Sequence, residues 1–190
     1  MESKGETEKI RKNDYSPLPL FSLSFAFREY LMFKKGPIEG VIIKPIKKFV
    51  DDRGWLAELF REDELNSKTL MPVMSYISFT LPGVVRGPHE HVEQTDYFCF
   101  IGPSNFKLVL WDNRKGSGTF GNKMVVFVGE DNPASVIIPE GVVHAYKNVG
   151  SKDGAVMNFP NRLFMGEGKR SKIDEIRHED DPDSPFKVDE

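Results

Sequence analysis

The sequence predicts an all-β domain, built as a sandwich or a small barrel. Turn signals made of Gly, Pro, Asn and Asp recur about every 8–15 residues and separate short runs rich in β-branched and aromatic residues. Within residues 106–111, apolar and polar side chains alternate as in a strand with one buried face. The runs that we expect to form strands are 41–46, 55–60, 75–81, 97–101, 106–111, 123–128, 135–138 and 155–159.

The length and composition of the chain fit one such domain. Its 190 residues are 39% hydrophobic and 12% aromatic, which suffices for one sizeable core but hardly for two. The formal net charge is −3 and both signs are scattered along the chain, without the basic stripe that binds nucleic acid. No run of about 20 apolar residues predicts a membrane span. We therefore expect neither a nucleic-acid partner nor a membrane partner.

Two regions flank the predicted barrel. Residues 1–37 are expected to form an N-terminal extension whose charged start is disordered and whose apolar, aromatic part packs on the barrel or acts as a dimer arm. The barrel itself is assigned to residues 38–165. Residues 166–190 are assigned to an acidic tail that packs on the barrel. His178 lies in that tail and is expected to be a solvated surface histidine.

The cysteine content and the N-terminus predict the compartment. Cys99 is the only cysteine and falls in an apolar run, so we expect a buried, inert thiol and no disulfide within the chain. The charged N-terminus lacks the apolar core and the small-residue cleavage site of a signal peptide. The expected location is the reducing cytoplasm.

Three of the four histidines lie in one spaced pattern that also carries glycines and prolines at its turns. Its residues are Gly83, Arg86, Pro88, His89, His91, Asp96 and Gly102 in the first half, and Pro139, Gly141, His144 and Asn148 in the second. Side chains at i and i+2 of a strand point to the same face, so His89 and His91 can converge on one point. His144 can join them if the sheet rolls into a small barrel.

This pattern resembles the two motifs of the cupin superfamily, whose small barrels hold a metal or a base in the barrel mouth. The resemblance implies a cupin-type double-stranded β-helix, that is, a jelly-roll barrel. Longer stretches narrow the resemblance to the dTDP-4-dehydrorhamnose 3,5-epimerases, over about residues 38–186 and in the right order. Those stretches are 51–60, 84–89, 111–121, 138–145 and 176–182.

The resemblance implies an isomerase that acts on a dTDP-4-keto-6-deoxyhexose in deoxysugar and polysaccharide biosynthesis. The C4 ketone acidifies the C–H bonds at C3 and C5. Epimerisation there needs a base, a group that stabilises the enolate oxygen and an acid on the opposite face. By resemblance His89 is the base. Asp96 and His144, from the same histidine pattern, are the further candidate catalytic residues. No cofactor is required for this reaction, and family members pair, which implies a homodimer.

The substrate-binding residues also follow from the resemblance. Arg53 and Arg86 match arginines that bind the nucleotide diphosphate, for which a bidentate guanidinium is well suited. Glu58 would accept a hydrogen bond from the thymine or the ribose, and Trp55 would stack on a base. Ion pairing at the surface is the alternative role for Arg53, Arg86 and Glu58.

The chain departs from the family pattern at several functional positions. Asp96 stands where the family has a lysine, and His91 where it has a glutamine. The strand tyrosine that usually serves as the acid falls at Met157 or a neighbour. The carboxylate that orients the base lies in the family's C-terminal tail, where Asp181 or Asp189 is the candidate replacement.

The first two departures complete a set of three imidazoles and one carboxylate: His89, His91, Asp96 and His144. Such ligands suit Zn²⁺, Fe²⁺, Mn²⁺ or Ni²⁺, and a divalent ion would polarise the C4 ketone in place of the lysine. In that case His89 is a ligand and is not the base. A metal-free, hydrogen-bonded cluster is the equal alternative.

Other functions remain open from the sequence. A 3,4-ketoisomerase fits the His89 and His91 pair, since related cupins move a carbonyl with such a pair. A non-catalytic cupin that binds a sugar or a metal fits the missing lysine and tyrosine. A metal-dependent dioxygenase is a weaker option, because it leaves the arginines of the diphosphate type unexplained.

Overall fold

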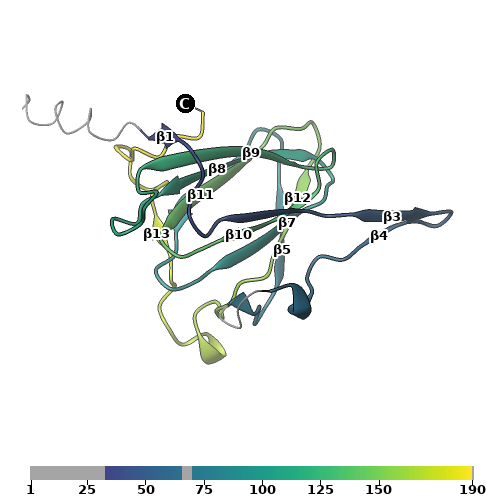
Figure 1. The fold of residues 1–190 in the computed structure, drawn as a ribbon, viewed down its shortest axis with the longest axis horizontal. Helices are drawn as coiled ribbons and strands as arrows, with labels where there is room; N and C mark the ends of the chain where they lie inside the picture. Colours follow the sequence, from purple (N-terminus) through teal and green to yellow (C-terminus); the bar gives the residue numbers. More distant parts are fainter. Residues whose placement is uncertain (1–32, 66–69, 190) are drawn as a thin grey trace, which may run out of the picture. The chain divides into compact units, whose positions relative to one another are not determined.

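The computed structural model describes residues 33–65 and 70–189, and in them the chain forms two main β-sheets (Figure 1). The six-stranded sheet has the order β1 (Lys34–Lys35), β9 (Asn122–Gly129), β8 (Asn105–Asp112), β11 (Val142–Asn148), β6 (Val85–Glu90), β13 (Ile176–Arg177). The five-stranded sheet has the order β2 (Ile42–Pro45), β10 (Ala134–Ile138), β7 (Asp96–Phe100), β12 (Gly154–Asn158), β5 (Tyr76–Thr80). Two short 3₁₀ turns are η2 (Glu62–Glu64) and η4 (Glu167–Lys169).

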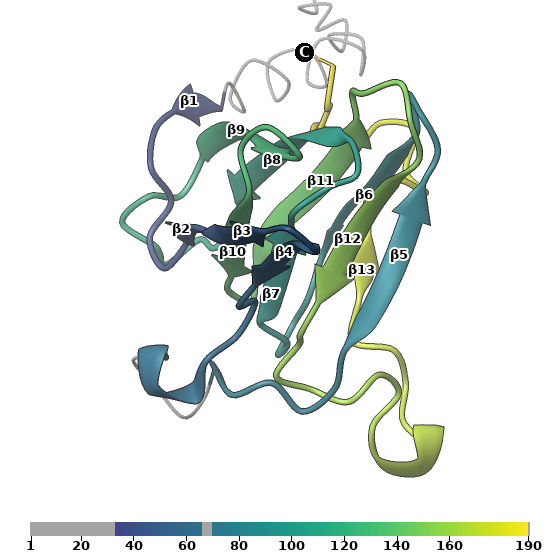
Figure 2. The same ribbon diagram turned by 90° about the vertical axis from the view of Figure 1, so that its right-hand side faces the viewer.

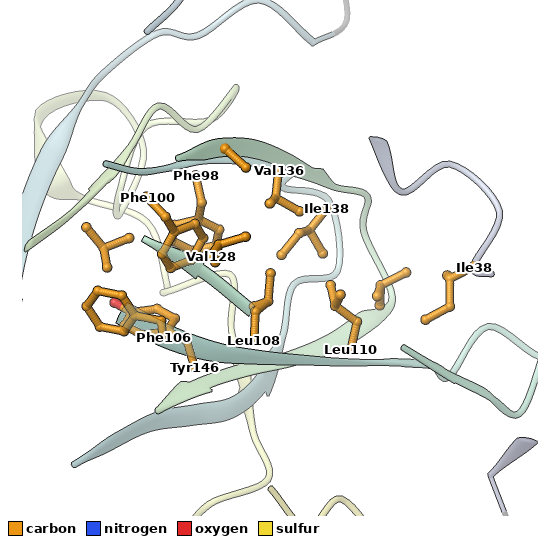
Figure 3. Packing of buried hydrophobic residues seen from close by; sticks show 13 residues of the cluster. Ile38, Phe98, Phe100, Phe106, Leu108, Leu110, Val128, Val136, Ile138 and Tyr146 are labelled. Carbon is orange, nitrogen blue, oxygen red and sulfur yellow. The ribbon is translucent and has the colours of Figure 1, made fainter. Parts of the chain in front are cut away.

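The two sheets face each other across one apolar core, as Figure 2 and Figure 3 show. Aromatic and branched side chains on alternate positions of facing strands point into the space between the sheets, as the period-two pattern requires. Phe100, Phe106, Leu108 and Val136 are fully buried there. Each such side chain stabilises the fold by roughly 1.5–3 kcal/mol through burial of apolar surface. The all-β prediction is confirmed, and the described residues hold no helix that is long and apolar enough to cross a membrane.

Strands β3 (Lys48–Asp51) and β4 (Gly54–Ala57) form a hairpin that is separate from the two main sheets. They pair only with each other, and Figure 1 shows them extending beyond the two sheets on the side opposite β13. The sequence pattern predicted one strand over 55–60 here. The structure has a tight hairpin because Asp51 accepts a hydrogen bond from the backbone N–H of Arg53, which closes the turn.

The stretch 111–121 is a structural turn between β8 and β9. The buried carboxylate of Asp112 accepts hydrogen bonds from Arg114 Nε at 2.8 Å, Ser117 Oγ at 2.7 Å and Thr119 Oγ1 at 2.5 Å. A buried carboxylate is stable only with such partners. This run of the sequence therefore shapes the barrel, because Asp112 holds Arg114, Ser117 and Thr119 within the turn.

The C-terminal stretch adds a strand and an apolar contact to the six-stranded sheet. Strand β13 pairs with β6, and Phe186 and Val188 pack on Trp111 and Val143. His178 contradicts the expectation of a solvated side chain, because its Nε2 lies 3.0 Å from Glu90 Oε1 and its ring packs against Phe186. The prediction for residues 1–32 of the N-terminal extension lies outside the described residues, whereas β1 pairs in parallel with β9.

Candidate active site

Strands β6 and β11 bring the two halves of the histidine pattern together. They are antiparallel neighbours in which His144 lies directly opposite His89. The ring centroids of His89 and His144 are 4.4 Å apart, and that of His91 is 5.5 Å from His89 and 5.9 Å from His144. The three imidazoles therefore share one hollow of the barrel, although His144 lies about 50 residues after the other two in sequence.

A glycine makes this close approach possible. Gly87 has φ +80°, and a Cβ atom there would lie 2.6 Å from the backbone carbonyl oxygen of His144. Only glycine fits such a contact and adopts this backbone conformation readily. A side chain at this position would push β6 away from β11 and so separate His89 from His144.

The carboxylate of Asp96 lies beneath the histidines at the start of β7. Its Oδ2 is 3.2 Å from His91 Nε2 and 3.3 Å from His144 Nε2. Its Oδ1 accepts hydrogen bonds from Gln94 Nε2 at 2.9 Å and Asn158 Nδ2 at 2.8 Å. Asp96 is completely buried, so these contacts replace its hydration.

Backbone carbonyls fix the tautomers of two histidines. Nδ1 of His144 lies 3.1 Å from the carbonyl oxygen of Val142, and Nδ1 of His91 contacts the carbonyl oxygen of Asp174. A carbonyl oxygen can only accept, so both Nδ1 atoms carry hydrogen. In the neutral rings both Nε2 atoms then present lone pairs to Asp96 Oδ2. Three acceptor atoms meet at one point, which requires a proton or a cation between them.

The charges of this cluster follow from its burial and its hydrogen bonds. Burial alone would lower the pKa of His91, but the hydrogen bond and the charge of Asp96 outweigh burial and raise it to about 9. Burial alone would raise the pKa of Asp96, but its contacts with His144 and His91 hold it below its ordinary value. A proton on His91 Nε2 faces Asp96 Oδ2 at neutral pH and so stabilises the buried carboxylate.

His89 has a different environment from its two neighbours. Burial, followed by the charges of His144 and His91, lowers the pKa of His89 to about 2, so its ring is neutral at pH 7. Its Nδ1 lies 3.5 Å from Glu175 Oε1, and Glu175 is in turn paired with Arg177 at 3.0 Å. The carboxylate beside the expected base is thus Glu175. The expected replacements are wrong, since Asp181 accepts the N–H of Asp183 and Asp189 pairs with Lys147.

Asp174 holds Glu175 in place. Its side chain accepts the backbone N–H groups of Val92, Glu93 and Gln94 at 2.8–3.0 Å, just after His91. Three hydrogen bonds to one carboxylate anchor the C-terminal stretch to the loop between β6 and β7. The pairing of β13 with β6 extends this anchor.

Two cavities open at the histidines, and four residues line both of them: Tyr76, His89, Glu175 and Arg177. The larger has a volume of about 750 Å³, includes His91, and has an apolar wall and two lysines from the segment 160–173. The smaller has a volume of about 360 Å³ and includes Arg86 and Tyr146. Together they are large enough for a small ligand whose reactive part lies against His89.

The structure places the expected substrate-binding residues in two different locations. Arg86 lines the smaller cavity, where its Nε donates to Thr80 Oγ1 and its Nη2 to the carbonyl oxygen of Phe79. Arg53 and Trp55 lie on the projecting β3–β4 hairpin, and Glu58 follows it and pairs with Arg61. The side chain of Arg53 is 84% exposed and pairs with Asp51. Only Arg86 therefore joins the histidines within one chain.

Comparison with known proteins identifies the family of this chain. A sequence profile of the dTDP-4-dehydrorhamnose 3,5-epimerase family matches residues 35–170. The spore coat polysaccharide biosynthesis protein SpsL of Bacillus subtilis is 37% identical to this chain over 67% of the chain and 82% of its own length. A probable low-salt glycan biosynthesis epimerase of Haloferax volcanii is 35% identical over 67% of this chain and 81% of its own length.

Solved structures share the fold. A dTDP sugar isomerase from Desulfovibrio desulfuricans aligns with a TM-score of 0.69 at 24% identity, over 80% of this chain and 93% of its own. The dTDP-4-dehydrorhamnose 3,5-epimerase of Sulfolobus tokodaii aligns with a TM-score of 0.56 at 28% identity, over 67% and 74% of the two chains. The predicted jelly-roll barrel is confirmed. With the profile match over most of its barrel, this chain belongs to the dTDP-4-dehydrorhamnose 3,5-epimerase family, as its sequence motifs predicted, and is an epimerase of nucleotide-activated sugars.

Proposed function

We propose that this protein inverts a carbon next to the ketone of a dTDP-4-keto-6-deoxyhexose, with His89 as the base. The family supports this reaction class, and relatives named for polysaccharide and glycan biosynthesis support a role in deoxysugar assembly. The expected compartment remains the cytoplasm. The observation that carries the proposal is a neutral imidazole, His89, which lies in two adjoining cavities with a carboxylate beside it.

Glu175 supports His89 as the base. A neutral imidazole with a low pKa is a weak proton acceptor unless its charged form is stabilised as it appears. Glu175 Oε1, at 3.5 Å from Nδ1, is close enough to accept a hydrogen bond from the imidazolium once the substrate proton arrives. His89 is therefore neutral at the start, with one ring nitrogen able to accept a proton. Glu175 stabilises its positive charge after it has taken that proton.

The proposed substrate contacts require two copies of the chain. Arg86 lines one cavity beside His89, whereas Arg53, Trp55 and Glu58 line neither of the two cavities. They lie on or beside the hairpin that extends beyond the two sheets (Figure 1). The exposed apolar side chains of Val50 and Leu56 on the same hairpin favour contact with another protein surface. We therefore propose a homodimer in which this hairpin contributes to the site of the partner.

Deuterium exchange tests the proposed reaction. The protein is incubated with dTDP-4-keto-6-deoxyglucose in D₂O, and NMR follows deuterium at C3 and C5 together with the appearance of an epimer. We expect both signals. No deuterium at either carbon after long incubation contradicts the proposal, and a ketone that moves to C3 identifies a ketoisomerase instead.

The cluster also supports an alternative role as a metal site, in which His89 is a ligand and is not the base. Nε2 of His91, Nε2 of His144 and Oδ2 of Asp96 converge as three acceptors. His89 lies beside them, and one ring nitrogen from each of the three histidines lies within 4.8 Å of the others. Both Nδ1–H groups donate to backbone carbonyls, which is the arrangement that orients metal-binding histidines. A divalent Zn, Fe, Mn or Ni ion would replace the proton on His91 and would act as a Lewis acid on the ketone.

Elemental analysis separates the two roles. Mass spectrometry of the purified protein is compared with that of His91→Gln and of His178→Gln, a histidine outside the cluster. A stoichiometric ion that is lost only in His91→Gln supports the metal. Full epimerase activity after dialysis against a chelator contradicts it and leaves the proton on His91.

A further inference from the structure

Inversion at carbon requires two groups on opposite sides of the substrate. The base removes a proton from one face, and an acid must return a proton to the other face. His89 and Glu175 together form the base and its support. The expected acid is missing from the strand near Met157, because Asn158 occupies the inward position of β12 and has no proton to give at neutral pH.

A phenol from the neighbouring strand reaches the same place. Tyr76 lies on β5 directly opposite Asn158, so the two side chains share a face of the sheet. Asn158 Nδ2 donates one hydrogen bond to the hydroxyl oxygen of Tyr76 at 2.9 Å and another to Asp96 Oδ1 at 2.8 Å. The hydroxyl of Tyr76 thus accepts within the protein, and its own hydrogen is left to point into the cavities that Tyr76 lines together with His89.

We propose, on the basis of the proposed epimerase function, that Tyr76 is the acid that protonates the substrate carbon on the face opposite His89. In the first step the C–H bond breaks, its proton goes to His89 and its electron pair enters the enolate. In the second step the O–H bond of Tyr76 breaks, a new C–H bond forms on the other face and the ketone is restored. The imidazolium then returns its proton to the phenolate through solvent, so no net proton is gained.

The surroundings suit Tyr76 to this step. Burial and the negative charge of Asp96 raise the pKa of Tyr76, so it holds its proton until a strong acceptor such as the enolate carbon appears. The hydrogen bond from Asn158 then stabilises the phenolate oxygen. Tyr76 is also partly exposed, which leaves room for substrate beside it.

Tyr146 is the competing phenol and is less suitable. It lines only the smaller cavity, is 4% exposed and packs among Phe98, Phe100 and Phe106 in the core. Its hydroxyl is paired with Ser78 Oγ at 3.0 Å. A substrate carbon cannot approach a hydroxyl in that position as it can approach Tyr76.

Separate measurement of exchange and inversion tests the assignment. Wild type, Tyr76→Phe and Tyr146→Phe are incubated with dTDP-4-keto-6-deoxyglucose in D₂O, and NMR follows deuterium in the recovered substrate and the amount of epimer. In Tyr76→Phe, we expect the epimer to fall on the order of 10²–10⁴-fold. Deuterium should still enter the substrate, because His89 continues to remove and return the proton on its own face. Tyr97→Phe is the matched control and should behave as wild type. It also loses a phenol hydroxyl, but one that donates to the Leu59 carbonyl on the other side of the sheet.

The outcomes are distinct. If Tyr76→Phe forms epimer at the wild-type rate, or if exchange and inversion fall together, Tyr76 is not the acid. Loss of inversion with preserved exchange in Tyr146→Phe and not in Tyr76→Phe assigns the role to Tyr146 and also overturns the proposal. Absence of exchange in the wild type itself contradicts the proposed function and is recognised before any variant is compared.

Discussion

The histidine cluster and the β3–β4 hairpin both carry residues that the sequence pointed to, yet they are built in opposite ways. In the cluster, His91 and His144 are fixed by hydrogen bonds to backbone carbonyls, and Asp96 is held by Gln94 and Asn158. In the hairpin, Arg53 pairs with Asp51 two residues away, and Trp55 lies under Lys48 of the adjacent strand. The hairpin contacts are local and exposed.

The difference shows which residues are ready to act within one chain. A buried polar group must find its partners inside the protein, so its position is set before any ligand arrives. An exposed arginine or tryptophan is under no such constraint and can change partners at little cost. The cluster therefore depends on the fold of its own chain, whereas the hairpin is suited to contact another molecule. Four experiments test this contrast.

The largest effect is expected from His89→Gln. Glutamine keeps a polar side chain of similar reach but cannot take the substrate proton, so we expect kcat for epimer formation to fall on the order of 10²–10⁴-fold. NMR of the product measures the rate, and calorimetry with dTDP should show binding close to that of wild type. A His89→Gln variant with a tenth or more of wild-type activity would show that another group is the base.

The next effect concerns pH and His91. Its pKa is raised to about 9 in the folded protein, above the value of about 6.5 in the unfolded chain. The folded state therefore binds the extra proton between these values. The resulting stability is complete below about pH 6.5 and is lost as the pH rises through 9, with a total on the order of 3 kcal/mol.

Urea unfolding between pH 6 and pH 9.5 measures this change. The charged groups that face His91 are Asp96 and Asp174, and the neighbouring imidazoles are His89 and His144. His91→Gln should flatten the profile, whereas Arg53→Ala, on the hairpin, should keep the wild-type slope. An equally steep profile in His91→Gln would place the proton elsewhere.

A smaller effect is expected from Glu175→Gln. Glutamine can no longer stabilise the imidazolium of His89 with a full charge, so we expect kcat to fall about 10- to 100-fold, less than in His89→Gln. The pH dependence of kcat should also shift, which a purely structural loss would not produce. Glu167→Gln, on η4 and outside the two cavities, is the control.

The smallest effect on stability is expected from Arg53→Ala. Its exposed ion pair with Asp51 contributes no more than about 1 kcal/mol to the free energy of unfolding. Its effect on activity should instead appear across the dimer. When Arg53→Ala and His89→Gln are unfolded together and refolded as a mixture, some dimers combine an intact hairpin with an intact cluster. Recovery of activity above that of either variant supports this arrangement, and a mixture no better than its components contradicts it.

The sequence predicted most strands that carry continuous apolar runs, such as β7 and β10. Composition did not predict β6 or β11. The glycine and proline of β6 and the polar residues of β11 lower the strand propensity of these two segments. Pairing with neighbours keeps these strands in place. The spacing of the histidines was a better guide there than composition.

The site was predictable only where a motif marks it. His89, His91, Asp96 and His144 come from such a pattern, and they meet in one hollow. Glu175 and Tyr76 depend on which strands pair with β6 and β12, and sequence spacing does not determine that. For Glu175 the sequence offered one signal, namely its position directly before the stretch 176–182 that resembles the family.

The pairing of β13 with β6 also has a consequence for how the protein is made. The segment with His89 leaves the ribosome long before Asp174 and Glu175 are translated. A nascent chain therefore carries the histidines before it carries the carboxylate that supports His89. Termination ahead of the codon for Glu175 should lower epimerase activity at least as much as Glu175→Gln, because it removes both that carboxylate and the pairing of β13 with β6.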